Sequence, residues 1–230
     1  MADADLAAVG ALLAHPSRVL MLDALMAGRA LTVGELGRVS GVATSTASEH
    51  LSRLRDGGLV EVLAQGRHRY YRLAGPEVAH ALESLSHVAP PRPVRTLTQS
   101  ARARSLTEAR LCYDHIAGRR GVALHEGLQQ RGWLSPVAGG YAVTPEGRSV
   151  LTAWGVDVSA AQSSRRAFAR DCLDWTERRS HLSGALAAAV STALVDGPDP
   201  GFVRRRDDHR GLRVTDEGAR RLQELGSPAP

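Results

Sequence analysis

The stretch "LTVGELGRVSGVATSTASEHLSRLRDGG", residues 31–58, decides the fold of the N-terminal part of the chain. In its first half, Thr32 stands three residues before Glu35, which is the spacing of a capping box. This spacing predicts a short helix over about 33–39, and Gly41 supplies the residue that ends it.

The second half of the stretch, "TSTASEHLSRLRDGG", predicts a longer helix. We expect Thr44 or Ser45 to cap it and the glycine pair to close it. Ala47, Leu51 and Leu54 fall on one apolar stripe at helical spacing. A short helix, a tight turn and a capped second helix together predict a helix-turn-helix.

The flanking sequence completes a winged form of this motif. Apolar residues at helical spacing predict helices over 4–14 and 17–27. After the motif, "LVEVLAQGRHRYYRL" alternates as a strand does and turns at Gln65-Gly66, which predicts a β-hairpin with an arginine-rich tip. A further helix is predicted over 76–88, so we place a winged helix domain for DNA binding and dimerisation at 1–88.

The segment "APPRPVR" breaks the pattern with three prolines and predicts a Pro/Arg-rich linker over 89–105. Beyond it the chain repeats itself. "ARLCYDH" and "ARDCLDW" align at an offset of sixty, and "VTPEG" matches "VTDEG" at an offset of seventy-one. We therefore predict a C-terminal domain at 106–227 built of two repeats, 106–157 and 166–227.

Each repeat is expected to contain two helices, a hairpin and a closing helix. The overall prediction is a mainly α protein with small β-hairpins, of the α+β class. It consists of an N-terminal winged helix-turn-helix and a duplicated, mostly helical C-terminal domain with winged-helix-like hairpins.

Composition points to an anionic partner. The 230 residues carry a formal net charge of +5, and every basic residue is an arginine. Such a surplus is most often directed at nucleic acid. The N-terminal apolar run is too short and interrupted for a signal peptide or a membrane span, so we expect a cytoplasmic protein that does not bind membranes. Because thiols stay reduced in the cytoplasm, we do not expect the two cysteines to form a structural disulfide.

The predicted DNA-binding residues follow from the motif. A recognition helix lays polar residues of its outer face against base edges in the major groove, whereas basic residues pair with phosphates. The predicted set lies on the second helix and on the hairpin tip: Thr44, Ser45, Ser48, Glu49, His50, Ser52 and Arg53, then Arg67, His68 and Arg69. A winged helix that contacts only protein is the alternative.

Three segments together resemble the ArsR family of bacterial winged-helix repressors over roughly residues 5–88: "HPSRVLMLDAL", the stretch quoted above with "LVEV", and "GRHRYYRL". The resemblance implies a homodimer that binds a palindromic operator in double-stranded DNA and leaves it when an effector binds. It also implies dimerisation through the first helix and the helix at 76–88.

Two effector sites known in that family have incomplete counterparts in this sequence. Arsenic- and cadmium-sensing members carry paired thiolates where this chain has Thr32 and Gly34. Zinc-type members use ligands on the dimerisation helix, where His80 and Glu83 share a face, but the upstream half of that pattern is missing. We expect effector binding to lie in the C-terminal domain.

The residues proposed for that effector site are Cys112, His115, Cys172, Trp175 and His181. We expect Cys112 and His115 one turn apart on a helix, an arrangement that suits a soft or borderline metal ion. At the same offset Cys172 is followed by Trp175, so the ligand pair does not look duplicated. The alternatives are that both thiols are buried apolar residues, or that the aromatic residues of this domain line a pocket for an organic effector.

The function predicted from the sequence is a sequence-specific DNA-binding transcriptional regulator. We expect a dimeric repressor released from its operator by an effector in the C-terminal domain. A metal-responsive repressor that uses Cys112, His115 and Cys172 is one alternative, and a DNA-bridging architectural protein without effector is another. No catalytic motif is found, so we predict that the protein is not an enzyme.

Overall fold

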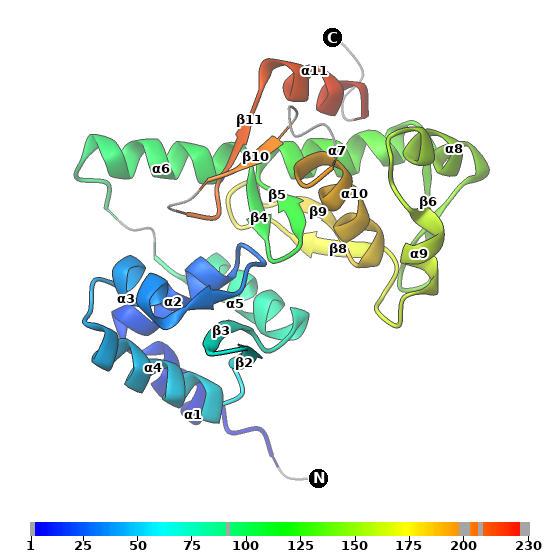
Figure 1. The fold of residues 1–230 in the computed structure, drawn as a ribbon. Coiled ribbons are helices and arrows are strands. Elements are labelled where there is room, and N and C mark those ends of the chain that lie inside the picture. The colour runs from blue at the N-terminus through cyan, green and yellow to red at the C-terminus, as the bar shows by residue number, and fades with distance from the viewer. Residues whose placement is uncertain (1–2, 91–92, 198–202, 207–208, 226–230) are drawn as a thin grey trace. The chain divides into compact units, whose positions relative to one another are not determined.

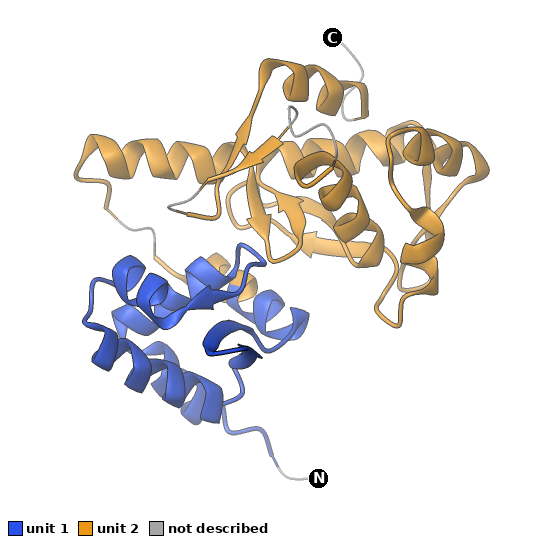
Figure 2. Cartoon of the chain, in the orientation of Figure 1, with its two compact units in different colours: residues 1–82 blue, residues 83–230 orange. Residues whose placement is uncertain are grey.

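The computed structural model describes residues 3–90, 93–197, 203–206 and 209–225. Figure 1 shows its helices and strands, and Figure 2 shows the two compact units into which the chain divides, residues 1–82 and 83–230. The division falls within helix α5 (Pro76–Val88), six residues before the domain end predicted at 88. Glu83, the first residue of the second unit, is buried and pairs with Arg110 and Arg210 of the same unit.

The first unit contains helices and a small sheet in the order expected of a winged helix. The elements are α1 (Leu6–Leu13), α2 (Pro16–Leu25), β1 (Leu31–Thr32), α3 (Val33–Ser40), α4 (Thr44–Asp56), β2 (Val60–Gln65) and β3 (His68–Leu73). The strands form an antiparallel sheet in the order β1-β3-β2. The fold class predicted from the sequence is confirmed.

The core of this unit is built by the apolar stripes of its helices. Leu22 of α2, Leu36 of α3 and Leu51 of α4 are almost completely buried. They lie where α2 contacts α3 and α3 contacts α4, so the packing fixes the angle of the helix-turn-helix. The opposite face of α4 remains free to carry polar residues.

The sequence predicted the N-terminal cap of α3 but not that of α4. The Thr32 hydroxyl and the Glu35 carboxylate form the capping box that begins α3, and Gly41 ends this helix with a φ of 70°. Helix α4, however, has Ala43 as its N-cap and no side-chain cap, so the predicted cap at Thr44 or Ser45 was wrong. Both hydroxyls lie inside the first turn instead.

After α5, the next helix of the second unit begins inside the predicted linker. Helix α6 (Leu97–Glu108) is capped by the Thr96 hydroxyl and occupies much of the segment 89–105. The remaining elements are β4 (Arg110–Cys112), β5 (His115–Ala117), α7 (Arg119–Gln130), β6 (Leu134–Val137), β7 (Gly140–Val143), α8 (Pro145–Ala153), α9 (Val158–Ser163), β8 (Arg170–Leu173), β9 (Ser180–Ser183), α10 (Ala185–Val195), β10 (Val203–Arg205), β11 (Leu212–Val214) and α11 (Asp216–Leu225).

The duplication is visible in the order of these elements. Each half consists of a hairpin, a helix, a second hairpin and a helix: β4-β5, α7, β6-β7 and α8, then β8-β9, α10, β10-β11 and α11 (Figure 1). The first element of each repeat is therefore a hairpin and not a helix, which corrects the predicted order. The two glycines that follow these hairpins, Gly118 and Gly184, have φ values of 80° and 97° and are the N-caps of α7 and α10.

The second unit has its own apolar core, to which both repeats contribute. Leu128 and Leu151 of the first repeat and Leu186 and Leu222 of the second belong to one buried cluster. Residues 226 and 227, the end of the second predicted repeat, lie outside the described residues. Among the described helices, none is by itself long and apolar enough to span a membrane; α1 and α2 qualify only as a pair bent by 94°.

Candidate functional site

Helix α4 presents most of the predicted recognition residues on its surface. Thr44, Ser45, Ser48, Glu49 and Arg53 are exposed, and Ser52 is partly exposed. Their placement follows from the helical period, because the opposite face of α4 carries the buried residues Ala47, Leu51 and Leu54. The exposed face thus offers hydroxyl groups, one carboxylate and one guanidinium.

His50 was predicted at the edge of this face as a residue that contacts DNA, but the structure buries it. Its side chain is buried and packs against His15, with 4.3 Å between the ring centroids. Burial, together with the neighbouring His15 and Arg18, lowers the pKa of His50. His50 therefore holds α4 against the start of α2 and is not available to a base edge.

Glu49 and Arg53 form an ion pair one helical turn apart. Arg53 Nη2 donates to Glu49 Oε1 at 2.7 Å, and both side chains are more than half exposed. Pairing with Arg53 offsets the negative charge of Glu49 on this face of α4. Because the pair is exposed, breaking it costs little free energy.

The wing is the hairpin β2-β3. Its strands pair from Val60 opposite Leu73 to Gln65 opposite His68, so Gly66 and Arg67 form the turn. Arg67, His68 and Arg69 are all exposed, as predicted for a tip that contacts phosphates.

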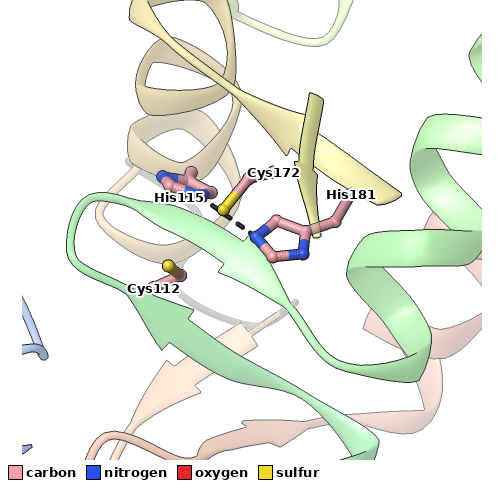
Figure 3. A group of neighbouring side chains, drawn as sticks. All are labelled: Cys112, His115, Cys172 and His181. Carbon is pink, nitrogen blue, oxygen red and sulfur yellow. Dashed lines mark hydrogen bonds between the residues drawn. The ribbon is translucent and has the colours of Figure 1, made fainter. Parts of the chain in front are cut away.

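A second candidate site lies in the second unit, where two hairpins bring four sulfur and nitrogen donors together (Figure 3). Cys112 pairs directly with His115 across β4-β5, and Cys172 pairs with His181 across β8-β9. One donor atom of each residue lies within 4.8 Å of the others, and all four side chains are buried. The donor set of two thiols and two imidazoles is that of many zinc sites.

The geometry corrects how the sequence was interpreted. Cys112 and His115 lie on paired strands, because the tight turn between them, with Tyr113 at a φ of 65°, forms a hairpin and not a helical turn. The counterpart of His115 in the second repeat is His181, so the cross-strand Cys/His pair is duplicated, contrary to the prediction. The alignment missed it because the hairpin between Cys172 and His181 has a longer loop than the one between Cys112 and His115.

A signal in the sequence could have found this equivalence. "HIAG" at 115–118 and "HLSG" at 181–184 both end in the glycine that caps the following helix. Aligning on these segments and allowing a gap in the hairpin pairs the histidines. Trp175, also proposed for the site, lies outside the cluster; the Arg110 guanidinium lies 5.0 Å from its ring centroid.

Each histidine of the cluster has a carboxylate beside its Nδ1 atom. His115 Nδ1 lies 3.1 Å from Asp114 Oδ1, and His181 Nδ1 lies 3.3 Å from Asp174 Oδ2. The two Nε2 atoms face each other at 3.2 Å. The two aspartates occupy equivalent positions in the repeats, and sequence analysis did not assign them a role at a metal site.

The electrostatics of the cluster depend on burial and on these partners. The hydrogen bond with Cys172, together with burial, raises the pKa of Cys112 to about 12, so without a metal the group is a thiol. Burial disfavours the charged form of His181, but Asp174 and Cys112 outweigh burial and raise its pKa. Burial also opposes ionisation of Asp174, yet His181 and Arg110 hold its pKa well below its usual range.

Asp174 also connects the cluster to a buried ionic network. It accepts a hydrogen bond from the Gly118 amide at 2.6 Å and lies 3.1 Å from Arg110 Nη2. The same guanidinium donates to Glu83 Oε1 at 2.5 Å, and Arg210 donates to Glu83 Oε2 at 2.9 Å. Glu83, considered above as a metal ligand on the helix at 76–88, is thus engaged by two arginines.

Comparison with known proteins relates the chain to regulators of transcription. A family model described as a helix-turn-helix domain matches residues 13–62. The uncharacterized HTH-type transcriptional regulator YdfF of Bacillus subtilis is 38% identical over 214 residues, which cover 93% of each chain. This match extends over both units. The HTH-type transcriptional regulator CmtR of Mycobacterium tuberculosis is 40% identical over 88 residues, 38% of this chain and 74% of that protein.

Among solved structures, the homodimeric winged helix-turn-helix DNA-binding domain of a possible ArsR-family regulator from Mycobacterium bovis is 33% identical. The similarity covers 38% of this chain and 88% of that one, with a TM-score of 0.34.

Proposed function

The chain belongs to the HTH-type transcriptional regulators, and from that premise we propose that it is a dimeric repressor of the ArsR type, released from a palindromic operator by an effector bound in its second unit. The observation that carries the proposal is the exposed polar face of α4 beside an arginine-bearing wing. Groups of this kind read base edges in the major groove and pair with phosphates.

The role of each surface follows from its chemistry. Ser48 supplies a hydroxyl that meets several bases, and Glu49 accepts from a cytosine amino group once Arg53 turns to a phosphate. Arg67 and Arg69 at the wing pair with phosphates in any sequence. Specificity therefore resides in α4, and general affinity resides in the wing.

Dimerisation is supported by apolar side chains that two helices leave uncovered. Leu6 on α1 is 77% exposed, and Val88 on α5 is 79% exposed. These are the helices through which the resemblance implies pairing of two chains. A dimer would cover such side chains and place two recognition helices about 34 Å apart, or at a multiple of that distance.

The effector is proposed to act in the second unit because that unit contains the buried Cys/His cluster. This observation favours the metal-responsive form of the repressor, in which Cys112, His115 and Cys172, now joined by His181, bind a metal ion. The other alternative, a DNA-bridging protein without effector, predicts that no ligand changes the affinity of the protein for DNA.

The test is fluorescence anisotropy of the purified full chain on the DNA upstream of its own coding sequence and on a scrambled duplex. We expect tight binding, with Kd below about 10⁻⁸ M at physiological salt, and at least about a thousandfold preference for the upstream DNA. Ser48→Ala is expected to change base preference. Arg220→Ala, which removes an exposed charge from α11, is the control; it should change neither the affinity for the upstream DNA nor the base preference. Equal affinity of the wild type for both duplexes would contradict the proposal.

A further inference from the structure

We propose that Cys112, His115, Cys172 and His181 bind one Zn²⁺ ion per chain in a closed tetrahedral site, to which each repeat of the second unit contributes one thiolate and one imidazole Nε2. The inference deepens the effector part of the proposed function and rests on it for its regulatory meaning. The binding of zinc itself stands independently of DNA binding.

The donor atoms are already close to the positions that a tetrahedral ion requires. With Zn–N bonds of about 2.0–2.1 Å, tetrahedral geometry places two imidazole nitrogens about 3.3 Å apart. The Nε2 atoms of His115 and His181 lie 3.2 Å apart. All four donors lie within 4.8 Å of one another, whereas Zn–S bonds of about 2.3 Å require sulfur atoms about 3.8 Å apart. Since no two donors are more than 4.8 Å apart, movements of about 1 Å, which side-chain rotations supply, bring them to this spacing.

The carboxylates beside the histidines provide an argument that does not depend on the donors themselves. Metal-binding histidines usually donate their other ring N–H to a carboxylate, which orients the ring and fixes its tautomer. Asp114 and Asp174 lie beside Nδ1 of His115 and of His181, which leaves both Nε2 atoms for the metal. The pair Cys-x-Asp with a cross-strand histidine occurs once in each repeat, so both halves of the site are built alike.

Charge balance favours a divalent ion in this buried place. Binding forms two Zn–S and two Zn–N bonds and releases to solvent the thiol protons of Cys112 and Cys172 and any proton on either Nε2 atom, so the bound cluster of Zn²⁺, two thiolates and two neutral imidazoles carries no net charge. A buried site without net charge avoids the large desolvation cost of an isolated ion. Sulfur and nitrogen donors exclude Mg²⁺ and Ca²⁺, which require oxygen ligands.

The position of the site gives the ion a mechanical role. Two of its ligands come from β4-β5 and two come from β8-β9, so the ion cross-links the repeats. The His181 partner Asp174 also contacts Arg110, which in turn binds Glu83 on α5. The metal site is thereby connected, through His181 and Asp174, to a chain of buried contacts that ends on the helix expected to pair two chains.

The experiment uses the full chain, stripped with a chelator under reducing conditions and titrated with Co²⁺ as a spectroscopic probe. We expect intense visible bands of tetrahedral Co²⁺ and a thiolate-to-cobalt charge-transfer band that both saturate at one Co²⁺ per chain. One equivalent of Zn²⁺ should abolish them. Cys112→Ser and His181→Ala should lose the four-coordinate spectrum.

Two further variants separate ligation from folding. His125→Gln removes a buried histidine that also contacts a carboxylate, Asp171, but lies outside the cluster, and it should keep the wild-type spectrum. Asp174→Asn should keep the spectrum while weakening the affinity for Zn²⁺ by about 10–100-fold. Tryptophan fluorescence of each variant checks that the second unit is folded.

Saturation at one Co²⁺ per chain with these variant effects supports the inference. A folded wild type that binds no Co²⁺, or that gives a weak octahedral spectrum without a charge-transfer band, would overturn it. Such a result, obtained on protein that still prefers its upstream DNA, would leave the proposed DNA-binding function intact. If the protein gives a four-coordinate spectrum but does not prefer its upstream DNA, the result would support the zinc site and contradict the proposed repressor function.

Discussion

Replacing Glu83 by glutamine should destabilise the second unit by about 3 kcal/mol at pH 7. The Glu83 carboxylate is 1% exposed and accepts from Arg110 and Arg210 at 2.5 and 2.9 Å, while those arginine side chains are 0% and 5% exposed. Glutamine keeps the size of the side chain but removes its charge, so two buried guanidinium groups lose their shared counterion. Removing one partner of a buried ion pair costs about 3–5 kcal/mol.

The pKa of Glu83 gives a second route to the same magnitude. Burial opposes ionisation, but Arg210 and Arg110 outweigh burial and lower the pKa from 4.5 to about 2. That difference corresponds to about 3 kcal/mol of stabilisation. Because the folded-state pKa is the lower one, this contribution is present above pH 4.5 and is lost as the pH falls from about 4.5 to about 2.

The assay is urea unfolding followed by tryptophan fluorescence, which reports on the second unit alone because all three tryptophans, Trp133, Trp154 and Trp175, lie there. With an m-value of about 2 kcal/mol/M, the midpoint should fall by about 1.5 M urea at pH 7. As the pH falls from 4.5 to 2, the unfolding free energy of the wild type should fall toward that of the Glu83→Gln variant.

The control is Glu126→Gln, which breaks a solvent-exposed pair with Arg179 in the same unit. Such pairs contribute at most about 1 kcal/mol, so this midpoint should barely move. If Glu83→Gln costs less than about 1 kcal/mol at pH 7, or if both proteins lose stability equally on acidification, the reasoning about the buried network is refuted.

Three further predictions concern the other parts of the chain. Arg67→Ala should weaken binding to upstream and scrambled DNA alike and reduce the slope of log K against log salt by about one. The slope is measured by anisotropy from about 50 to 200 mM salt, and an unchanged slope would show that the wing does not contact DNA. Leu51→Ala should destabilise the first unit by about 2–5 kcal/mol in circular dichroism, because its side chain is 0% exposed, and a loss below about 1 kcal/mol would contradict its place in the core. Zn²⁺ at about a thousand times its Kd should raise the unfolding free energy of the wild type by about 4 kcal/mol and leave Cys172→Ser unchanged; equal stabilisation of both would place the ion elsewhere.

The first unit was predictable from the sequence because its signals are local. The capping box of Thr32 and Glu35, the glycine at 41 and the apolar stripe through Leu51 each act within a few residues. The burial of His50 depends on tertiary packing instead. His50 is polar by type, and its burial involves packing against His15, the N-cap residue of α2, which lies far from it in the sequence.

The second unit was less predictable because its hairpins are short and their partners are distant. A strand of three residues such as β4 has no period to detect, so "ARLCYDH" was interpreted as a helical turn. The duplication itself was visible, but the longer loop before His181 hid the equivalence of the histidines. The roles of Asp174 and Glu83 arise from contacts with residues more than twenty positions away, which no local pattern encodes.

The most direct test of the account is one anisotropy experiment on labelled upstream DNA, with the full chain stripped of metal and then loaded with one Zn²⁺ per chain. We expect the stripped wild type to bind tightly and the loaded wild type at least about tenfold more weakly, whereas Cys172→Ser binds alike in both conditions. Equal affinity of the wild type with and without Zn²⁺ would contradict the claim that this regulator senses a metal through its second unit.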